Sequence, residues 1–168
     1  MTLGARAELK AANEDQEKNA EPIAPISKEL VVGLVGYVGA GCTTAARRLA
    51  MLLEDEGYEV QRIKLSDLIE EMAPPGSIPT VKDGIEGGRS KFERAEALQG
   101  MGDKLREDHG DFAVASLAAK RIQELRGDRR PGEHKIAFIL DSIKHSTEVN
   151  LLRQVYDRSF RLIAVHCE

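Results

Sequence analysis

The chain has 168 residues, a formal net charge of −4, 4% aromatic residues and no tryptophan. It lacks the run of about 20 apolar residues that a membrane-spanning helix needs, and we expect no secretion signal. The two cysteines, Cys42 and Cys167, cannot build a disulfide framework or an all-cysteine zinc site. The slightly acidic balance disfavours nucleic-acid binding, which needs clustered positive charge. We therefore expect a soluble, cytoplasmic protein.

The predicted elements begin after a polar N-terminal region. Residues 1–28 carry too little apolar surface to offset the entropy of ordering, so we expect a disordered tail before one domain at 29–168. Short apolar runs predict strands over residues 30–35, 59–65, 135–140 and 160–165. Helical periodicity predicts helices over residues 45–56, 66–72, 91–105, 111–126 and 147–156.

Three details complete this prediction. Ser66 is expected to cap the second helix. Residues 73–90, with three prolines and four glycines, are expected to form a long loop. Because strands alternate with helices, the chain is predicted to be an α/β protein with a doubly wound parallel sheet and right-handed crossovers.

The clearest motif follows the first strand. It has the phosphate-loop order of glycine, four residues, glycine, lysine and serine or threonine, except that Cys42 stands where lysine belongs. Glycines let backbone N–H groups converge on phosphate oxygens, and the following helix N-terminus adds partial positive charge. We assign nucleotide-phosphate binding to Gly36, Gly39, Gly41, Cys42, Thr43 and Thr44. The alternative is a tight strand-to-helix turn that binds nothing.

The missing lysine bears on the chemistry. In phosphate-loop enzymes this lysine reaches the β- and γ-phosphates and offsets charge in the transition state. Cys42 cannot do so, because a cysteine is neutral or anionic. The motif therefore favours a binding site without catalysis over a working kinase, and none of these residues is assigned a catalytic role.

An acidic residue closes the third predicted strand. Asp141 follows the apolar run at 135–140, in the position of the acid that coordinates magnesium in phosphate-loop proteins. With Thr43 it is the candidate partner of Mg²⁺, directly or through water. The alternative is that Asp141 only caps a turn.

Two arginines form the third candidate group. Arg94 and Arg106 lie twelve residues apart on a predicted helix with an expected break near residues 100–102. Such a break would aim both guanidinium groups over the strand ends, where each could grip a substrate phosphate bidentately. The alternative is a solvated basic face.

These motifs resemble known families. Residues 94–106 resemble the substrate-phosphate helix of deoxynucleoside monophosphate kinases. A closer resemblance covers about residues 29–166 and is to the N-terminal kinase-like domain of the bacterial anti-phage dCTP deaminases, in the deoxycytidylate deaminase superfamily. It is carried by LVVGLVGYVG at 30–39, IKLS at 63–66, ILDSIKH at 139–145, EVNLLR at 148–153 and LIAV at 162–165.

The resemblance implies a P-loop NTPase fold of the nucleoside monophosphate kinase type, with the same loop, acid and arginine positions binding a nucleotide. In that family the kinase-like domain precedes a zinc-dependent deaminase domain, and the whole protein depletes dCTP during phage infection. The phosphate loop is often degenerate there, as at Cys42. The implied role is a regulatory domain whose partners are a nucleotide (ATP, a dNTP or a dNMP), with Mg²⁺, and a deaminase domain or subunit. Self-association stays open.

The deaminase chemistry itself is not expected in these residues. A zinc deaminase needs H-x-E and P-C-x-x-C, and the chain has no C-x-x-C. The final H-x-E at 166–168 has nothing to complete it, so zinc is expected only in a deaminase domain. Kinase-like folds usually add a lid and a fifth strand, so we expect a piece truncated after its fourth strand. An active deoxynucleoside monophosphate kinase and a structural module that binds no nucleotide remain as alternatives.

Overall fold

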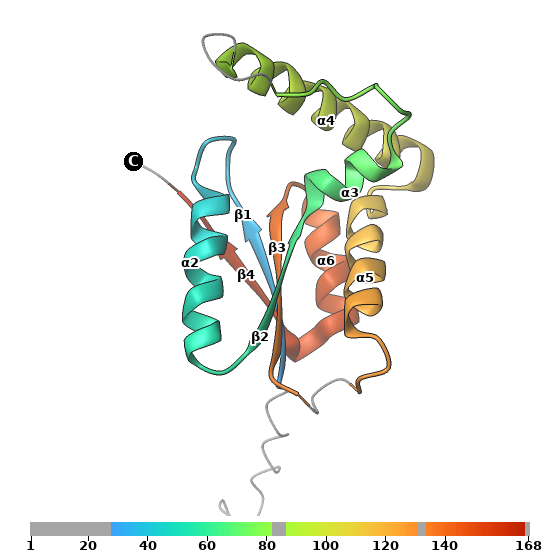
Figure 1. Ribbon diagram of the computed structural model, residues 1–168. Coiled ribbons are helices and arrows are strands. Elements are labelled where there is room, and N and C mark those ends of the chain that lie inside the picture. The colour runs from blue at the N-terminus through green and yellow to red at the C-terminus, as the bar shows by residue number, and fades with distance from the viewer. Residues whose placement is uncertain (1–27, 82–86, 131–133, 167–168) are drawn as a thin grey trace, which may run out of the picture.

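The computed structural model describes residues 28–81, 87–130 and 134–166 (Figure 1). Its strands are β1 (Glu29–Val35), β2 (Glu59–Lys64), β3 (Ile136–Ile143) and β4 (Phe160–Ala164). Its helices are α2 (Cys42–Asp55), α3 (Leu65–Met72), α4 (Gly87–His109), α5 (Ala113–Arg126) and α6 (Ser146–Tyr156), followed by the 3₁₀ turn η2 (Asp157–Ser159). The expected tail, apart from Lys28, and the end of the H-x-E sequence lie outside the described residues.

The four strands form one parallel sheet in the order β2-β3-β1-β4. This confirms the predicted α/β class with a parallel sheet. The order differs from that of the Rossmann fold, in which the second strand lies next to the first. Here β3 is the neighbour of β1, and Leu34 pairs with Asp141 near the ends of the two strands. Whatever follows β1 therefore lies beside the carboxyl end of β3.

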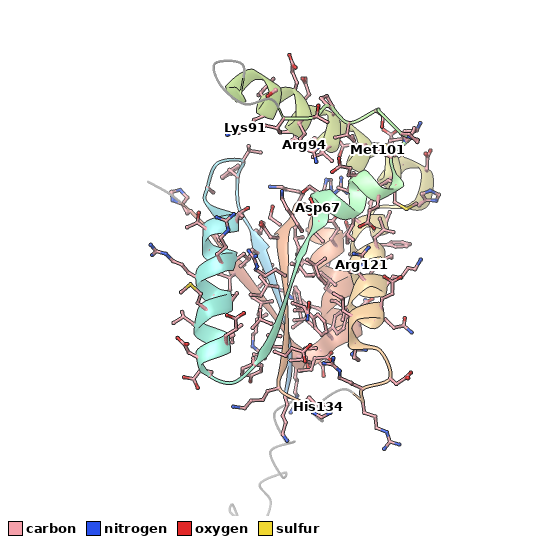
Figure 2. All side chains as sticks on the ribbon, in the orientation of Figure 1. Asp67, Lys91, Arg94, Met101, Arg121 and His134 are labelled. Atoms are coloured by element: carbon pink, nitrogen blue, oxygen red, sulfur yellow. The ribbon has the colours of Figure 1, made fainter. Side chains whose placement is uncertain are left out.

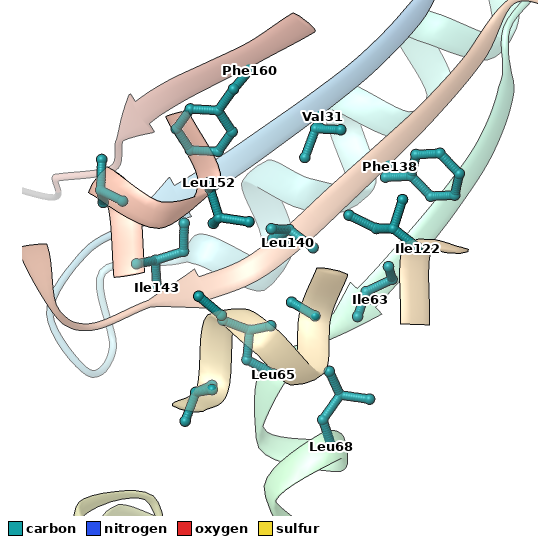
Figure 3. Close-up of a cluster of buried hydrophobic side chains, with 14 of the residues drawn as sticks. Val31, Ile63, Leu65, Leu68, Ile122, Phe138, Leu140, Ile143, Leu152 and Phe160 are labelled. Carbon is teal, nitrogen blue, oxygen red and sulfur yellow. The ribbon is translucent and has the colours of Figure 1, made fainter. Parts of the chain in front are cut away.

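Helices cover both faces of the sheet (Figure 1). On one face α2 packs on Val32, Leu34 and Ile139, mainly through Ala46 and Ala50. On the other face α3, α5 and α6 enclose the larger cluster, in which Phe138, Leu140, Ile143 and Leu152 are fully buried (Figure 3). The apolar sequence of β3 is typical of a strand that is covered on both faces.

All five predicted helix starts differ from the structure by one to four residues, and three of these differences bear on the cavity or on a predicted cap. α2 begins at Cys42, directly after the glycine loop, and not at residue 45. α4 begins at Gly87, inside the segment predicted to be a loop, because Gly87 and Gly88 mask its helical pattern. α3 begins at Leu65, so Ser66 lies within the first turn. Its hydroxyl contacts the Asp67 carboxylate at 3.3 Å and does not cap the helix, so that prediction was wrong.

The predicted break near residues 100–102 is also wrong, since α4 is continuous from Gly87 to His109. A Cβ atom at Gly102 would lie 3.3 Å from Cδ1 of Ile69 on α3. Gly102 therefore permits the close packing of α4 on α3. Figure 1 shows α4 lying across the end of the sheet toward which β1 and β3 point. Among the helices described, none is both long and apolar enough to cross a membrane.

Candidate functional site

A cavity of about 730 Å³ opens at the carboxyl ends of β1 and β3. Its walls are the glycine loop with the first turn of α2, the start of α3, the inner side of α4 and the connection from β3 to α6. Ligand sites of parallel α/β sheets lie at this end of the strands. The volume is in the range of small-molecule sites, roughly 300–1,000 Å³.

The first glycine of the loop is required by close packing. A Cβ atom at Gly36 would lie 2.7 Å from Sγ of Cys42 and 2.7 Å from the carbonyl oxygen of Val165. The backbone oxygen cannot move aside without disturbing the chain after β4. Gly36 thus lets the chain leave β1 directly beneath the start of α2.

The next two glycines are required by backbone conformation. Gly39 and Gly41 have φ values of +86° and +85°, in the left-handed region that glycine occupies without strain. Between them the N–H of Ala40 donates to the carbonyl of Tyr37 at 3.0 Å and closes a turn. Apart from the adjacent residues of the chain, no described atom lies within 4 Å of a Cβ placed on Gly39 or Gly41, so this side of the loop is open.

The loop leads into an uncapped helix start. Gly41 is the N-cap of α2, no side chain caps the helix, and its first turn holds no acidic residue. The first N–H groups of a helix have no partner within the helix, and together with the helix dipole they favour an anion. Cys42, Thr43 and Thr44 form this first turn and line the cavity. The arrangement suits a phosphate group.

Thr43 and Asp141 meet at the floor of the cavity. The Thr43 hydroxyl donates to Oδ2 of Asp141 at 2.8 Å, although the two residues are 98 positions apart in the sequence. Asp141 does not end its strand, as the sequence had suggested, because β3 continues to Ile143. The contact forms because β1 and β3 are neighbours.

These two oxygen donors fit a magnesium ion that arrives with a nucleotide. Mg²⁺ prefers hard oxygen ligands and is usually held by one or two carboxylates together with phosphates and water. In residues 28–81, 87–130 and 134–166 no group of three or more His, Cys, Asp or Glu side chains is placed so that it could hold a metal ion by itself. Thr43 and Asp141 would therefore hold such an ion jointly with phosphate, whose charge it would neutralise.

Arg94 lines the cavity but is engaged by an acid. Its guanidinium forms a two-pronged contact with the Glu70 carboxylate on α3, with Nη1 to Oε1 at 3.0 Å, and also donates to the carbonyl of Pro79 at 3.1 Å. Figure 2 shows Arg94 on the side of α4 that faces α3. The hydrogen bond from Arg94 lowers the pKa of Glu70 below its ordinary value and raises the pKa of Arg94.

Arg106 lines the same cavity and is more deeply buried than Arg94. Its Nε and Nη2 donate to Oε1 of Glu148 at 3.1 and 2.8 Å, and its Nη1 donates to Asp103 at 3.1 Å. The Glu148 side chain is 1% exposed and that of Arg106 is 9% exposed. The structure thus brings both predicted arginines to the cavity but directs their guanidinium groups to carboxylates.

The sequence motifs missed three residues of this site. The pairing of Glu70 and Glu148 with the two arginines gave no sequence signal, because the partners lie 24 and 42 positions apart. Lys144 was also missed, although its Nζ donates to the carbonyl oxygen of Gly36 in the loop, at 3.0 Å. The sequence position could have indicated it, because Lys144 comes three residues after Asp141 and directly follows β3, the strand that neighbours β1.

Comparison of the chain with models of known protein families and with curated proteins gives no match. The function is therefore inferred from the geometry of the site and from its sequence motifs. An open glycine loop, an uncapped helix N-terminus and a hydroxyl paired with a carboxylate together suit the binding of a phosphorylated ligand with Mg²⁺.

Proposed function

We propose that this chain is a nucleotide-binding, regulatory domain with the P-loop fold of the nucleoside monophosphate kinases. The loop at residues 36–44 binds the phosphates, and Thr43 and Asp141 hold the accompanying Mg²⁺. The observation that carries the proposal is the 2.8 Å contact between Thr43 and Asp141 beneath an open glycine loop. Cys42 removes the lysine on which phosphoryl transfer depends, so we propose binding without catalysis.

The proposed biological setting follows from the sequence resemblance. The ILDSIKH and EVNLLR segments, together with the order of the other motifs, resemble the kinase-like domain of the anti-phage dCTP deaminases. We propose that the nucleotide bound here regulates a zinc-dependent deaminase domain or subunit. Deoxycytidine nucleotides are accordingly the first ligands to test.

Calorimetric titration of the purified chain with dCTP, dCMP, dTTP and ATP in the presence of Mg²⁺ tests the binding. Saturable binding is expected for at least one of them. Gly41→Arg should abolish it, because the new side chain would fill the open side of the loop. Gly57→Arg is the matched control, since Gly57 also has a left-handed φ of +81° and open surroundings, and it follows α2 at the end away from the cavity.

The outcomes separate the alternatives. Binding that survives Gly57→Arg and is lost in Gly41→Arg supports a phosphate site at the loop. Equal loss in both variants would indicate a general effect of strain on the fold. The absence of binding to every nucleotide would favour a structural module.

A second candidate function is phosphotransfer to a deoxynucleoside monophosphate. It is favoured by one observation, namely that Arg94 and Arg106 line the same cavity as the loop. The test is incubation with ATP, Mg²⁺ and each dNMP, followed by chromatography for the diphosphate. Product formation would establish a kinase. Activity that appears only in a Cys42→Lys variant would indicate descent from one.

A further inference from the structure

Lys144 reaches the phosphate loop from the connection between β3 and α6. Its Nζ donates to the carbonyl oxygen of Gly36 at 3.0 Å, and its side chain is exposed at the cavity wall. The backbone that carries it is fixed, because the N–H groups of Lys144 and His145 both donate to Oε2 of the buried Glu148 at 3.2 Å. The flexible side chain of Lys144 thus extends its ammonium group from a backbone that is held in place.

Position 42 and the ammonium of Lys144 converge on the same residue. Sγ of Cys42 lies 2.7 Å from the place that a Cβ atom of Gly36 would occupy. The Lys144 ammonium contacts the carbonyl of that same Gly36. Cys42 approaches Gly36 from the start of α2, and Lys144 approaches it from the connection between β3 and α6. Lys144 therefore brings a positive charge to the part of the loop that a lysine at position 42 would serve.

The charges around the cavity distinguish Lys144 from the arginines. Arg94 is neutralised by Glu70, and Arg106 is neutralised by Glu148 and Asp103. In the part of the chain that the structure describes, the Lys144 ammonium has no carboxylate within ion-pair distance and contacts only a neutral carbonyl. An ammonium in that setting can exchange a neutral acceptor for a charged phosphate oxygen, which makes the stronger hydrogen bond.

We propose that Lys144 supplies the phosphate-binding ammonium that Cys42 cannot, so that the lysine of the phosphate loop is relocated to the β3–α6 connection. The ligand class is a nucleoside triphosphate, because the loop lysine serves the β- and γ-phosphates. The inference rests on the proposed function, since it requires that the loop bind a nucleotide.

The test compares triphosphate and monophosphate affinity in calorimetric titrations with Mg²⁺, using dCTP with dCMP and ATP with AMP. Lys144→Met should weaken triphosphate binding about tenfold to a hundredfold, the usual effect of losing a hydrogen bond to a charged group. Monophosphate binding should weaken less. Lys144→Arg should retain part of the triphosphate affinity because it keeps the charge.

Two controls address other lysines. Lys120→Met removes an exposed lysine of α5, 3.9 Å from Glu124, and should leave every affinity unchanged. Lys91→Met removes the lysine that lines the cavity from α4, and it should weaken triphosphate binding less than Lys144→Met does. The reverse order of these two effects would overturn the proposal.

The double variant Cys42→Lys with Lys144→Met tests the relocation itself. Returning a lysine to position 42 should restore triphosphate affinity lost in Lys144→Met, whereas a general defect in folding would not be rescued. If the lysine is not tolerated at buried position 42, as judged from circular dichroism, the single variants decide alone. A wild-type chain that binds no nucleotide overturns the proposed function. Equal triphosphate affinity in the wild-type chain and in Lys144→Met would overturn only the role of Lys144.

Discussion

The guanidinium of Arg106 donates two hydrogen bonds to one oxygen of Glu148, at 3.1 and 2.8 Å, and thereby joins α4 to the first turn of α6. The other oxygen of Glu148 accepts the N–H groups of Lys144 and His145. A single buried carboxylate thus positions the helix above the cavity and the connection that carries Lys144. Arg106, which the sequence predicted to bind a phosphate, therefore helps to hold these two parts of the cavity wall in place.

This arrangement predicts a large loss of stability when Arg106 is removed. Arg106→Met leaves Glu148 buried without its cation, and breaking a buried pair in this way costs about 3–5 kcal/mol. Arg121→Met is the matched control, because Arg121 also contacts two acids, Glu71 and Glu124, but on the surface. There we expect a loss of about 1 kcal/mol or less. Urea unfolding followed by circular dichroism measures both, and equal losses would contradict a structural role of the buried pair.

The contact between Thr43 and Asp141 predicts how binding depends on magnesium. Asp141→Asn keeps the hydrogen bond to Thr43 possible but removes the negative charge that would favour the ion. The ratio of triphosphate affinity with Mg²⁺ to that with a chelator should fall by about tenfold, as is typical when an outer partner of a metal is lost. Asp67→Asn, on α3, is the control and should leave the ratio unchanged. An unchanged ratio in Asp141→Asn would remove Asp141 from the site.

The pairing of Glu70 with Arg94 predicts a dependence of stability on pH. The hydrogen bond from Arg94 holds the pKa of Glu70 below its ordinary value of 4.5. Because the folded pKa is the lower one, the pair stabilises the fold above the ordinary value, and this contribution is lost as the pH falls through the folded pKa. The stability difference between the wild-type chain and Glu70→Gln should therefore shrink on acidification.

Carboxyl NMR and urea midpoints across the acidic range measure this effect. Arg94→Met should return the pKa of Glu70 to its ordinary range, because the variant removes the hydrogen bond that is the main cause of the lowered pKa. If the pKa of Glu70 is the same in the wild-type chain and in Arg94→Met, the two side chains are not paired in solution.

Local chemistry explains which parts of this molecule were predictable. The buried runs of β1 and β3 and the turns at Gly39 and Gly41 follow from residue type alone, because an apolar run needs cover and a left-handed φ favours glycine. The acids that hold the two arginines do not. Their pairing depends on how α4 lies across α3 and α6, which is decided by packing between segments far apart in the sequence.

The same reasoning about packing distinguishes the two glycines that were expected to break α4. Alanine is favoured over glycine inside a helix by about 0.8–1 kcal/mol. Apart from its chain neighbours and the nearby backbone of its own helix, no described atom lies within 4 Å of a Cβ placed on Gly100, so Gly100→Ala should raise the free energy of unfolding by about that amount. At Gly102 the Cβ would lie 3.2 Å from Nη1 of Arg106 and 3.3 Å from Cδ1 of Ile69.

The guanidinium of Arg106 cannot easily move away from a methyl group added at Gly102, because Glu148 and Asp103 hold it. Gly102→Ala should therefore stabilise the protein less than Gly100→Ala, or destabilise it, since displacing these neighbours offsets the gain in helix propensity. Urea unfolding of the two variants under identical conditions measures the difference. Equal stabilisation would mean that α4 does not pack closely on α3 at this point and that the cavity has a looser wall than its hydrogen bonds indicate.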